Sequence, residues 1–327
     1  MRSAVSRCLG SMYAVAAAAS ALSGAAWSQN FPSKPVRYVV PFPAGTGNDM
    51  VARLVTEPLM RLWGQQIIVD NRGGASGTIA GAFVAKSAAD GYTLLHCNIA
   101  PNAISYAMIA KMQYSPNDFA PISRIGMPPN IIVVHPSVPL KSITELVEFA
   151  KSNPGKLSYA AGTVGTSPHL TMEWLKLRMK FDIVHVPYKN SGQGTSDVIA
   201  GQLPINVTNF PILVAPIKAG RLRALAVASA ERQALLPDVP TMREAGVPDF
   251  EVNSWYGVCA PAGTPAAVLD KVNADLHTVL RSREIEQRLS EMGMPPAPNS
   301  RADFEKFIRN EIDRWGQVVR DANIPKM

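Results

Sequence analysis

The chain carries, early in its sequence, Val36-Arg37-Tyr38-Val39-Val40-Pro41-Phe42-Pro43-Ala44-Gly45-Thr46-Gly47-Asn48-Asp49. Its first five residues are typical of a β-strand, and the prolines and glycines that follow end the strand in a loop. Apolar residues then recur with the period of a helix, at Val51, Leu54, Val55, Leu59 and Leu62. The stretch therefore predicts one strand-loop-helix unit.

The same alternation continues along the chain. Further strands are expected at residues 66–69, 92–96, 131–134, 157–160, 183–186, 204–207, 222–228 and 252–260. Helical periods lie between or after them, at residues 78–86, 142–152, 167–179, 195–200, 212–218, 265–280, 282–292 and 301–322. Strands that alternate with helices indicate an α/β fold with mostly parallel sheets and helices on both faces.

The first 28 residues have the three parts of a secretory signal. Arg2 and Arg7 precede an apolar stretch over residues 12–26, and Ala26-Trp27-Ser28 is a plausible cleavage site. The alternative is a membrane anchor, but the stretch is shorter than the roughly 20 residues that a spanning helix needs. We expect export to the periplasm with cleavage near Ser28, which leaves a chain long enough for two domains.

Charge and cysteine content narrow the possible partners. The whole chain has 32 Lys and Arg against 25 Asp and Glu, and the basic residues are scattered, so nucleic acid is not an expected partner. Cys97 and Cys259 remain after cleavage, far apart and each in an apolar run. An oxidising compartment would permit a disulfide, but two separate buried thiols are the expectation.

Three glycine-bearing loops each follow a predicted strand and precede a helix. They span residues 41–49, 71–78 and 161–169, and are named here the first, second and third glycine loops. Such loops lie at the carboxyl ends of parallel strands, and the free N–H groups of a helix start attract an anion. Because Arg72 is their only basic side chain, a small carboxylate fits better than a triphosphate. Ordinary helix capping is the alternative for any single loop.

Other classes of site find little support. The loops lack the spacing of a phosphate-binding Walker loop, of a dinucleotide fingerprint or of a nucleophile elbow. The five histidines show no metal-binding spacing, so neither a cofactor nor a metal is expected. His169 opens a predicted helix and is expected to be a local hydrogen-bond partner. The chain is not expected to be an enzyme, although a hydrolase stays open as a minor alternative.

Several motifs resemble the Bug family, the TctC-like extracytoplasmic receptors of tripartite tricarboxylate transporters. They lie in order along nearly all of the mature chain, at residues 31–37, 40–45, 69–72, 89–95, 185–189, 222–227, 236–241 and 260–265. The resemblance implies the type II periplasmic-binding fold, with two α/β lobes that close on a ligand like a Venus flytrap. Lobe 1 would comprise residues 29–130 and 256–327, and lobe 2 residues 131–255.

The resemblance also nominates ligand-binding residues. In lobe 1 they are Phe42, Ala44, Gly45, Thr46, Asn48, Ser76, Gly77 and Thr78, and in lobe 2 they are Gly162, Thr163, Thr166, Ser167, Tyr188 and Thr208. The chain departs from the family pattern where Thr46 and Asn190 replace glycines and where Thr208 replaces a frequent aspartate. Without that acid, amino acids become less suitable ligands than uncharged-tail or dicarboxylic acids.

The resulting hypothesis is a periplasmic solute-binding protein, monomeric, that captures a small organic carboxylate. Its further partners would be the integral-membrane subunits of a tripartite tricarboxylate-type transporter. A periplasmic sensor that feeds a two-component system is compatible with the same residues. The identity of the carboxylate stays open.

Overall fold

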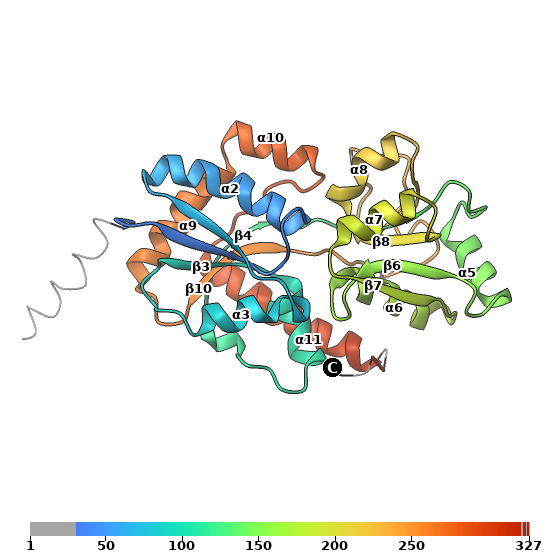
Figure 1. The fold of residues 1–327 in the computed structure, drawn as a ribbon, viewed down its shortest axis with the longest axis horizontal. Coiled ribbons are helices and arrows are strands. Elements are labelled where there is room, and N and C mark those ends of the chain that lie inside the picture. The colour runs from blue at the N-terminus through green and yellow to red at the C-terminus, as the bar shows by residue number, and fades with distance from the viewer. Residues whose placement is uncertain (1–30, 322, 325, 327) are drawn as a thin grey trace, which may run out of the picture.

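The computed structural model describes residues 31–321, 323, 324 and 326, so the expected signal peptide lies outside the described residues. Two five-stranded sheets lie side by side, each with helices on both of its faces (Figure 1). The fold is thus α/β and two-lobed, as the alternation of strands and helices predicts. Within the described part of the chain, no helix combines the length and apolar character needed to cross a membrane.

The first sheet has the strand order β2-β1-β3-β10-β4. Strands β1 (Val36–Val40), β2 (Ile67–Asn71) and β3 (Thr93–Asn98) are mutually parallel, as their helical connections require. Strand β10 (Tyr256–Pro261) runs antiparallel between β3 and β4 (Phe119–Gly126). The last strand of the chain thus completes the sheet that the first strand begins.

Helices cover both faces of this sheet. Helices α2 (Gly47–Trp63), α9 (Ala266–Leu280) and α10 (Arg283–Glu291) lie on one face, while α3 (Thr78–Ala85) and α11 (Arg301–Asp321) lie on the other (Figure 1). Between β3 and β4 the chain forms η2 (Ala100–Ile104), α4 (Ser105–Met108) and η3 (Pro116–Asp118). Trp315 and Phe304 of α11 are fully buried, which anchors the end of the chain on this lobe.

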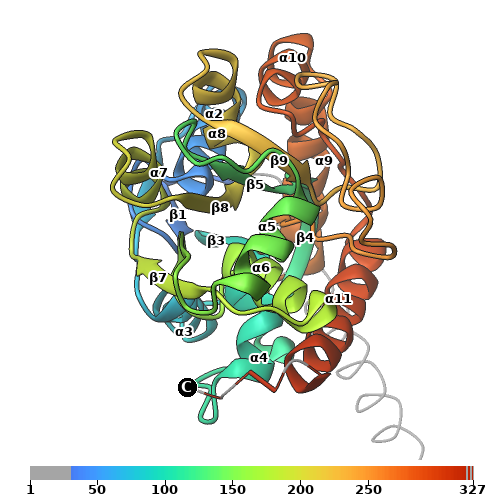
Figure 2. The ribbon, with the colours of Figure 1, turned by 90° about the vertical axis from the view of Figure 1, so that its right-hand side faces the viewer.

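The second sheet has the order β7-β6-β8-β5-β9. Strands β6 (Ser158–Gly162), β7 (Val184–Tyr188) and β8 (Ile205–Asn209) are parallel, whereas β5 (Asn130–Val134) is antiparallel to both β8 and β9 (Arg223–Val227). Figure 2 views the molecule from this end, with α5 (Ile143–Ser152) and α6 (Ser167–Met179) toward the viewer. Helices α7 (Ser191–Ile199) and α8 (Phe210–Lys218) cover the other face.

Two segments cross between the sheets and pair with each other. The first links β4 to β5, and the second links β9 to β10. The Asn130 N–H donates to the Val252 carbonyl oxygen (3.1 Å), and the Ser254 N–H donates to that of Pro128 (2.9 Å). Trp255 of the second segment is fully buried and packs edge-on against Phe304, so the crossing is anchored on the first lobe.

Some elements differ from the sequence-based expectation. Each sheet contains antiparallel pairs because a returning strand, β10 or β5, enters between or beside the parallel ones. Strand β4 was not expected, since Pro121 interrupts its apolar pattern. Helix α7 begins at Ser191 and not at residue 195, because the Asn190 side chain caps it by accepting from the Gly192 N–H (2.9 Å).

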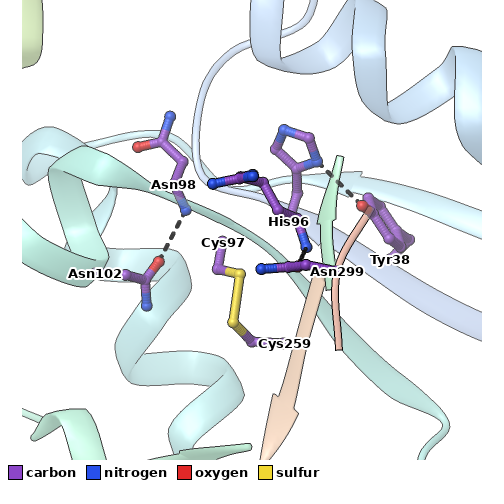
Figure 3. Close-up of a disulfide and its surroundings, with 8 residues drawn as sticks. Tyr38, His96, Cys97, Asn98, Asn102, Cys259 and Asn299 are labelled. Atoms are coloured by element: carbon purple, nitrogen blue, oxygen red, sulfur yellow. Dashed lines mark hydrogen bonds between the residues drawn. A yellow bond between two sulfur atoms is a disulfide. The ribbon is translucent and has the colours of Figure 1, made fainter. Parts of the chain in front are cut away.

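The expectation of two separate buried thiols is wrong: Cys97 and Cys259 form a disulfide (Figure 3). Strand register explains the pairing. Cys97 of β3 lies opposite Gly257 of β10 and Cys259 lies opposite Leu95, so the two cysteines are diagonal neighbours with their Cα atoms 5.8 Å apart. Their sequence separation of 162 concealed this proximity.

Candidate functional site

A pocket lies between the two sheets, at the carboxyl ends of their parallel strands. The first lobe contributes Phe42, Thr46, Asn48, Asn98, Ile99 and Ala100, and the second contributes Gly162, Thr163, Thr166, Ser167, Pro168, Tyr188, Lys189, Ser191, Thr208 and Asn209. Ser254 of the second crossing segment completes the wall.

Four helices begin at this pocket. Thr46 is the N-cap residue of α2, Thr166 that of α6 and Asn209 that of α8, while Ser191 is the first residue of α7. The first turn of a helix has N–H groups without helical partners and a partial positive charge. Two lobes therefore present helix starts to one enclosed volume, an arrangement that favours an anion.

The first glycine loop is held rigidly at the pocket. Thr46 Oγ1 donates to the Pro43 carbonyl oxygen (2.8 Å) and Gly45, with φ +78°, makes the turn. The Asp49 carboxylate accepts from the Gly45 N–H (3.0 Å) and from Arg53 Nε (3.0 Å). Burial alone would raise the pKa of Asp49, but hydrogen bonds from Arg53, Gly45 and Asn71 together with the Arg53 charge hold it below its usual value. The carboxylate thus stays ionised as a brace for the loop.

Asn48 connects the first loop to the end of β3. It is buried, and its Oδ1 accepts from Asn98 Nδ2 (2.6 Å). Asn98 is itself fixed, because its Oδ1 accepts from the Ala100 N–H (2.9 Å) and its own N–H donates to Asn102 Oδ1 (3.1 Å; Figure 3). Both asparagines line the pocket, and these hydrogen bonds hold their amide groups in place at its wall.

The second glycine loop does not line the pocket. Ser76, in the left-handed conformation (φ 54°), donates from its Oγ to the Val164 carbonyl oxygen (2.6 Å) and lies 3.2 Å from Thr163 Oγ1. This is a direct contact between the two lobes. Gly77, with φ +91°, packs against Pro41 and Pro101, where a Cβ atom would lie only 3.0 Å from Pro41 Cβ.

The third glycine loop forms the opposite wall. Thr166 Oγ1 donates to the Thr163 carbonyl oxygen (2.7 Å), and Thr166 packs so closely over Gly162 that a Cβ there would meet its Oγ1 at 2.6 Å. His169 is buried behind this wall, where its Nδ1 accepts from the Gly165 N–H (3.4 Å). Burial lowers the pKa of His169 to about 3, so it is a neutral local partner and not a ligand group.

The remaining wall comes from β7 and β8. Tyr188 Oη donates to Asp197 Oδ2 (2.5 Å), and this hydrogen bond, with burial and the carboxylate charge, raises the pKa of the phenol to about 12. Thr208 is 1% exposed, and its Oγ1 has no hydrogen-bond partner among the described residues. Lys189 is the only charged side chain among the described residues that line the pocket.

The structure brings nine of the nominated residues to the pocket, namely Phe42, Thr46, Asn48, Gly162, Thr163, Thr166, Ser167, Tyr188 and Thr208. Ala44, Gly45, Ser76, Gly77 and Thr78 are absent from its lining, because the first loop turns away at Gly45 and the second contacts the other lobe. Sequence reasoning missed eight lining residues: Asn98, Ile99, Ala100, Pro168, Lys189, Ser191, Asn209 and Ser254. Most of them follow a strand end or open a helix, so the carboxyl-end rule could have found them.

Among the residues that the structure describes, no three His, Cys, Asp or Glu side chains gather where they could hold a metal ion. The buried His96 illustrates the point. Its Nδ1 lies 3.1 Å from Tyr38 Oη, and burial lowers its pKa to about 3. It packs inside the first lobe between Tyr38 and Tyr256 and belongs to no group of three possible metal ligands among the described residues.

Comparison with known proteins agrees with this geometry. The chain is similar to protein BugT of Bordetella pertussis, with 35% identity over 90% of this chain and 91% of that protein. It is also similar to a protein from the tcbD-tcbE intergenic region of a Pseudomonas species, with 36% identity over 88% of this chain and 86% of the relative.

Solved structures give the same result. Rpa4515 of R. palustris with adipate superposes with a TM-score of 0.87 at 36% identity, covering 91% of this chain and all of that one. MatC of Rhodopseudomonas palustris with bound malate superposes with a TM-score of 0.84 at 31% identity, covering 88% of this chain and 100% of that one. The periplasmic binding protein BugD superposes with a TM-score of 0.86 at 30% identity, covering 91% of this chain and all of that one.

The sequence model of the tripartite tricarboxylate transporter family receptors matches residues 51–324, which is most of the chain. The matched residues include all of the second sheet, both crossing segments, the closing helices and every strand of the first sheet except β1. The chain therefore belongs to the TctC family of tripartite tricarboxylate transporter receptors, the Bug-type solute-binding proteins.

Proposed function

We propose that this protein captures a small organic carboxylate in the periplasm and delivers it to the membrane subunits of a tripartite tricarboxylate-type transporter. The observation that carries the proposal is the convergence of the α2, α6, α7 and α8 starts on one pocket. The partial positive charge of these helix starts attracts an anion, and Lys189 is the only charged side chain among the described lining residues.

The pocket chemistry supports an acid over other ligands. Sugars are held by aromatic platforms and many side-chain amides, whereas both ends of the Asn98 and Asn209 amides already have partners within the protein. An ammonium group would need a carboxylate, and no described residue that lines the pocket carries one. The adipate and malate bound by two structural relatives are both small organic acids.

We also propose how capture proceeds. Residues 29–130 and 256–327 form lobe 1, residues 131–255 form lobe 2, and the paired crossing segments act as the hinge. The ligand binds the nine nominated residues that line the pocket, and it favours the closed arrangement because only there does it contact both lobes. The protein acts as a monomer, and cleavage of the signal peptide near Ser28 releases it into the periplasm.

A thermal-shift screen tests the binding function. Mono-, di- and tricarboxylates, amino acids and sugars are each added to the purified mature protein. A true ligand at 100 times its dissociation constant adds about 2.7 kcal/mol to the free energy of unfolding, which raises the melting temperature. Stabilisation by acids alone is the expected result, and stabilisation by sugars or amines alone would refute the proposal.

Scattering and transport assays test the remaining parts. Small-angle X-ray scattering should show a monomer whose radius of gyration falls when the ligand is added. Transport of the same acid by cells should require both this protein and its membrane subunits. If uptake of the acid persists after the gene for this protein is deleted, the protein binds the acid but is not required for its transport.

A further inference from the structure

Two histidines contact the third glycine loop from within the second lobe. His169, near the start of α6, accepts from the Gly165 N–H at Nδ1 (3.4 Å). His185, on β7, places Nε2 3.1 Å from the Gly162 carbonyl oxygen, to which this nitrogen donates when it carries the ring hydrogen. One imidazole therefore holds the first residue of the segment 162–165, and the other holds its last.

This segment is part of the pocket wall. Gly162 and Thr163 line the pocket, whereas neither histidine is among the described lining residues. The segment also meets the first lobe, since the Val164 carbonyl oxygen accepts from Ser76 Oγ (2.6 Å). The two histidines thus set the position of a wall that faces both the ligand and the other lobe, and they do so without lining the pocket.

The two imidazoles are packed against each other. Their ring centroids lie 4.5 Å apart, and the fully buried Tyr159 ring stacks on His185 with a centroid distance of 5.0 Å. Protonation of His169 would put a hydrogen on Nδ1, where the Gly165 N–H needs an acceptor. Protonation of His185 would put a cation beside the His169 ring. The pair therefore holds the loop only while both rings are neutral.

Charged side chains surround the pair, but they are bonded to one another. Tyr159 Oη of β6 donates to Glu173 Oε1 of α6 (2.8 Å). Lys176 Nζ of α6 lies 3.0 Å from Glu173 Oε1 and 3.1 Å from Asp182 Oδ1, just before β7. Both carboxylates are thus paired with the lysine, which leaves a net cation near the imidazoles if either of them is protonated.

Burial is the main reason that both imidazoles stay neutral. It lowers the pKa of His169 to about 3, assisted by His185 and Lys176. It also lowers the pKa of His185, although the hydrogen bond to Gly162 and the Glu173 charge oppose this shift. A histidine released from the loop would titrate near its ordinary pKa of about 6.5. The held loop is therefore fully favoured above about pH 6.5, and this preference is lost progressively as the pH falls.

We propose that His169 and His185 are positioning residues that hold the third glycine loop in its ligand-binding position as a pair of neutral imidazoles, so that acid releases the loop and weakens capture. This pair is named here the histidine clamp. The inference rests on the proposed function, because it assumes that the ligand binds in the pocket between the lobes. It adds regulation of that site by protons.

Amide hydrogen exchange, followed by NMR on the mature protein, tests the clamp without a ligand. His169→Leu removes the acceptor of the Gly165 N–H and should lower the protection of that amide at least 10-fold at pH 7. His169→Asn should restore it to within threefold, because its Oδ1 can replace Nδ1. The reference amide is Val184, which donates to the Leu157 carbonyl oxygen (2.8 Å) at the other end of strands β6 and β7.

The pH dependence of the same amide separates a clamp from simple packing. In the parent protein, the protection of Gly165 relative to Val184 should fall about 10-fold between pH 7 and pH 5, because protons favour the released histidines. A double variant, His169→Asn with His185→Gln, keeps an acceptor and a donor at the two positions but does not titrate. Its relative protection should stay constant over this range.

Calorimetry with adipate tests the consequence for capture. At pH 7, His169→Leu and His185→Leu should each weaken adipate binding about 10-fold, while His169→Asn and His185→Gln should stay within threefold of the parent. Between pH 7 and pH 5, the parent should lose more affinity than the double variant. The ratio of the two affinities at each pH cancels the titration of adipate itself.

His277→Leu is the matched control, since His277 Nε2 lies 2.9 Å from the Asn299 carbonyl oxygen in the first lobe, far in the fold from the third glycine loop. It removes the same kind of imidazole–carbonyl contact, and should leave both Gly165 protection and adipate affinity within twofold of the parent. Melting temperatures show which variants are folded.

Three results would overturn the clamp. They are normal Gly165 protection in the folded leucine variants, relative protection in the parent that does not change with pH, and loss of protection with no loss of adipate affinity. Each of them leaves carboxylate capture standing. If adipate does not bind the parent, the proposed function fails for this acid, and the hold of the histidines on the loop is still decided by amide exchange.

Discussion

The first and second glycine loops look alike in sequence, but the folded protein uses them differently. Each follows a parallel strand of the first sheet, contains small residues and hydroxyls, and precedes a helix. The first loop lines the pocket through Phe42, Thr46 and Asn48. The second loop instead contacts the opposite lobe through Ser76 and braces its neighbour, since Asn71 Nδ2 donates to the Phe42 carbonyl oxygen (3.0 Å).

The difference follows from position in the sheet. Strand β1 lies between β2 and β3, so the first loop is flanked on both sides, while β2 is an edge strand. The first glycine loop therefore lines the pocket between the lobes, and the second glycine loop contacts the third through Ser76 and Thr163. A similar local sequence can thus hold a ligand or hold two lobes together.

The largest effect on ligand affinity is expected in the first loop. Asn48→Leu replaces a pocket amide with an apolar side chain of similar size. The buried Asn98 Nδ2 then has no acceptor. Affinity for the tighter of adipate and malate should fall about 100-fold, or roughly 2.7 kcal/mol, in calorimetry. An affinity within threefold of the parent, in a variant that melts normally, would show that the first loop does not hold the ligand.

Alanine substitutions at one glycine of each loop test how tightly the first and second glycine loops are packed. Gly77→Ala places a Cβ atom 3.0 Å from Pro41 Cβ at a φ of +91°, so strain and crowding add. Gly45→Ala meets the same strain at φ +78°, but nothing lies within 4 Å of the new atom. We expect urea unfolding to show losses of about 2.5 and about 1 kcal/mol, respectively.

Gly155→Ala is the reference for strain alone, since Gly155 has φ +71° and open space around it, far from the pocket. It should match Gly45→Ala. Equal losses in all three variants would mean that the second loop is not packed as the structure shows.

The contact between lobes should have a smaller and uniform effect. Ser76→Ala removes the hydrogen bond to Val164 and so makes the closed arrangement less favourable by about 1 kcal/mol. Every ligand should bind about fivefold more weakly with unchanged relative affinities, as measured by calorimetry. Thr78→Ala is the control, because its Oγ1 donates only to Ala75 within the same loop. A change in ligand ranking with Ser76→Ala would instead place Ser76 in direct contact with the ligand.

The smallest effect is expected at Arg72, although it is the only cation of the three loops. Its Nε donates to Asp70 Oδ2 (2.8 Å) and its guanidinium lies over the Phe83 ring (3.6 Å), away from the pocket lining. Arg72→Ala should change ligand affinity less than twofold and the free energy of unfolding by under about 1 kcal/mol. Loss of binding in this variant would assign carboxylate capture to a cation and not to helix starts.

Much of the architecture was predictable because it depends on short-range patterns. The strand propensity of residues 36–40, the capped start of α2 and the apolar period of that helix are readable within about 30 residues. Ser167 was correctly predicted as the first residue of α6 for the same reason. Asn98 and Asn209 were missed because their elements, β3 and β8, end without a glycine-rich signal.

The α/β alternation and the helix starts that favour an anion follow from the sequence, and its motifs indicate the receptor family with its two lobes. The pairing of Cys97 with Cys259, the contact of Ser76 with Val164 and the lack of a partner for Thr208 Oγ1 among the described residues follow only from the three-dimensional fold. Propensity and periodicity act over one or two turns of chain, whereas these contacts join residues 88 to 162 positions apart or depend on which groups their neighbours have already bonded.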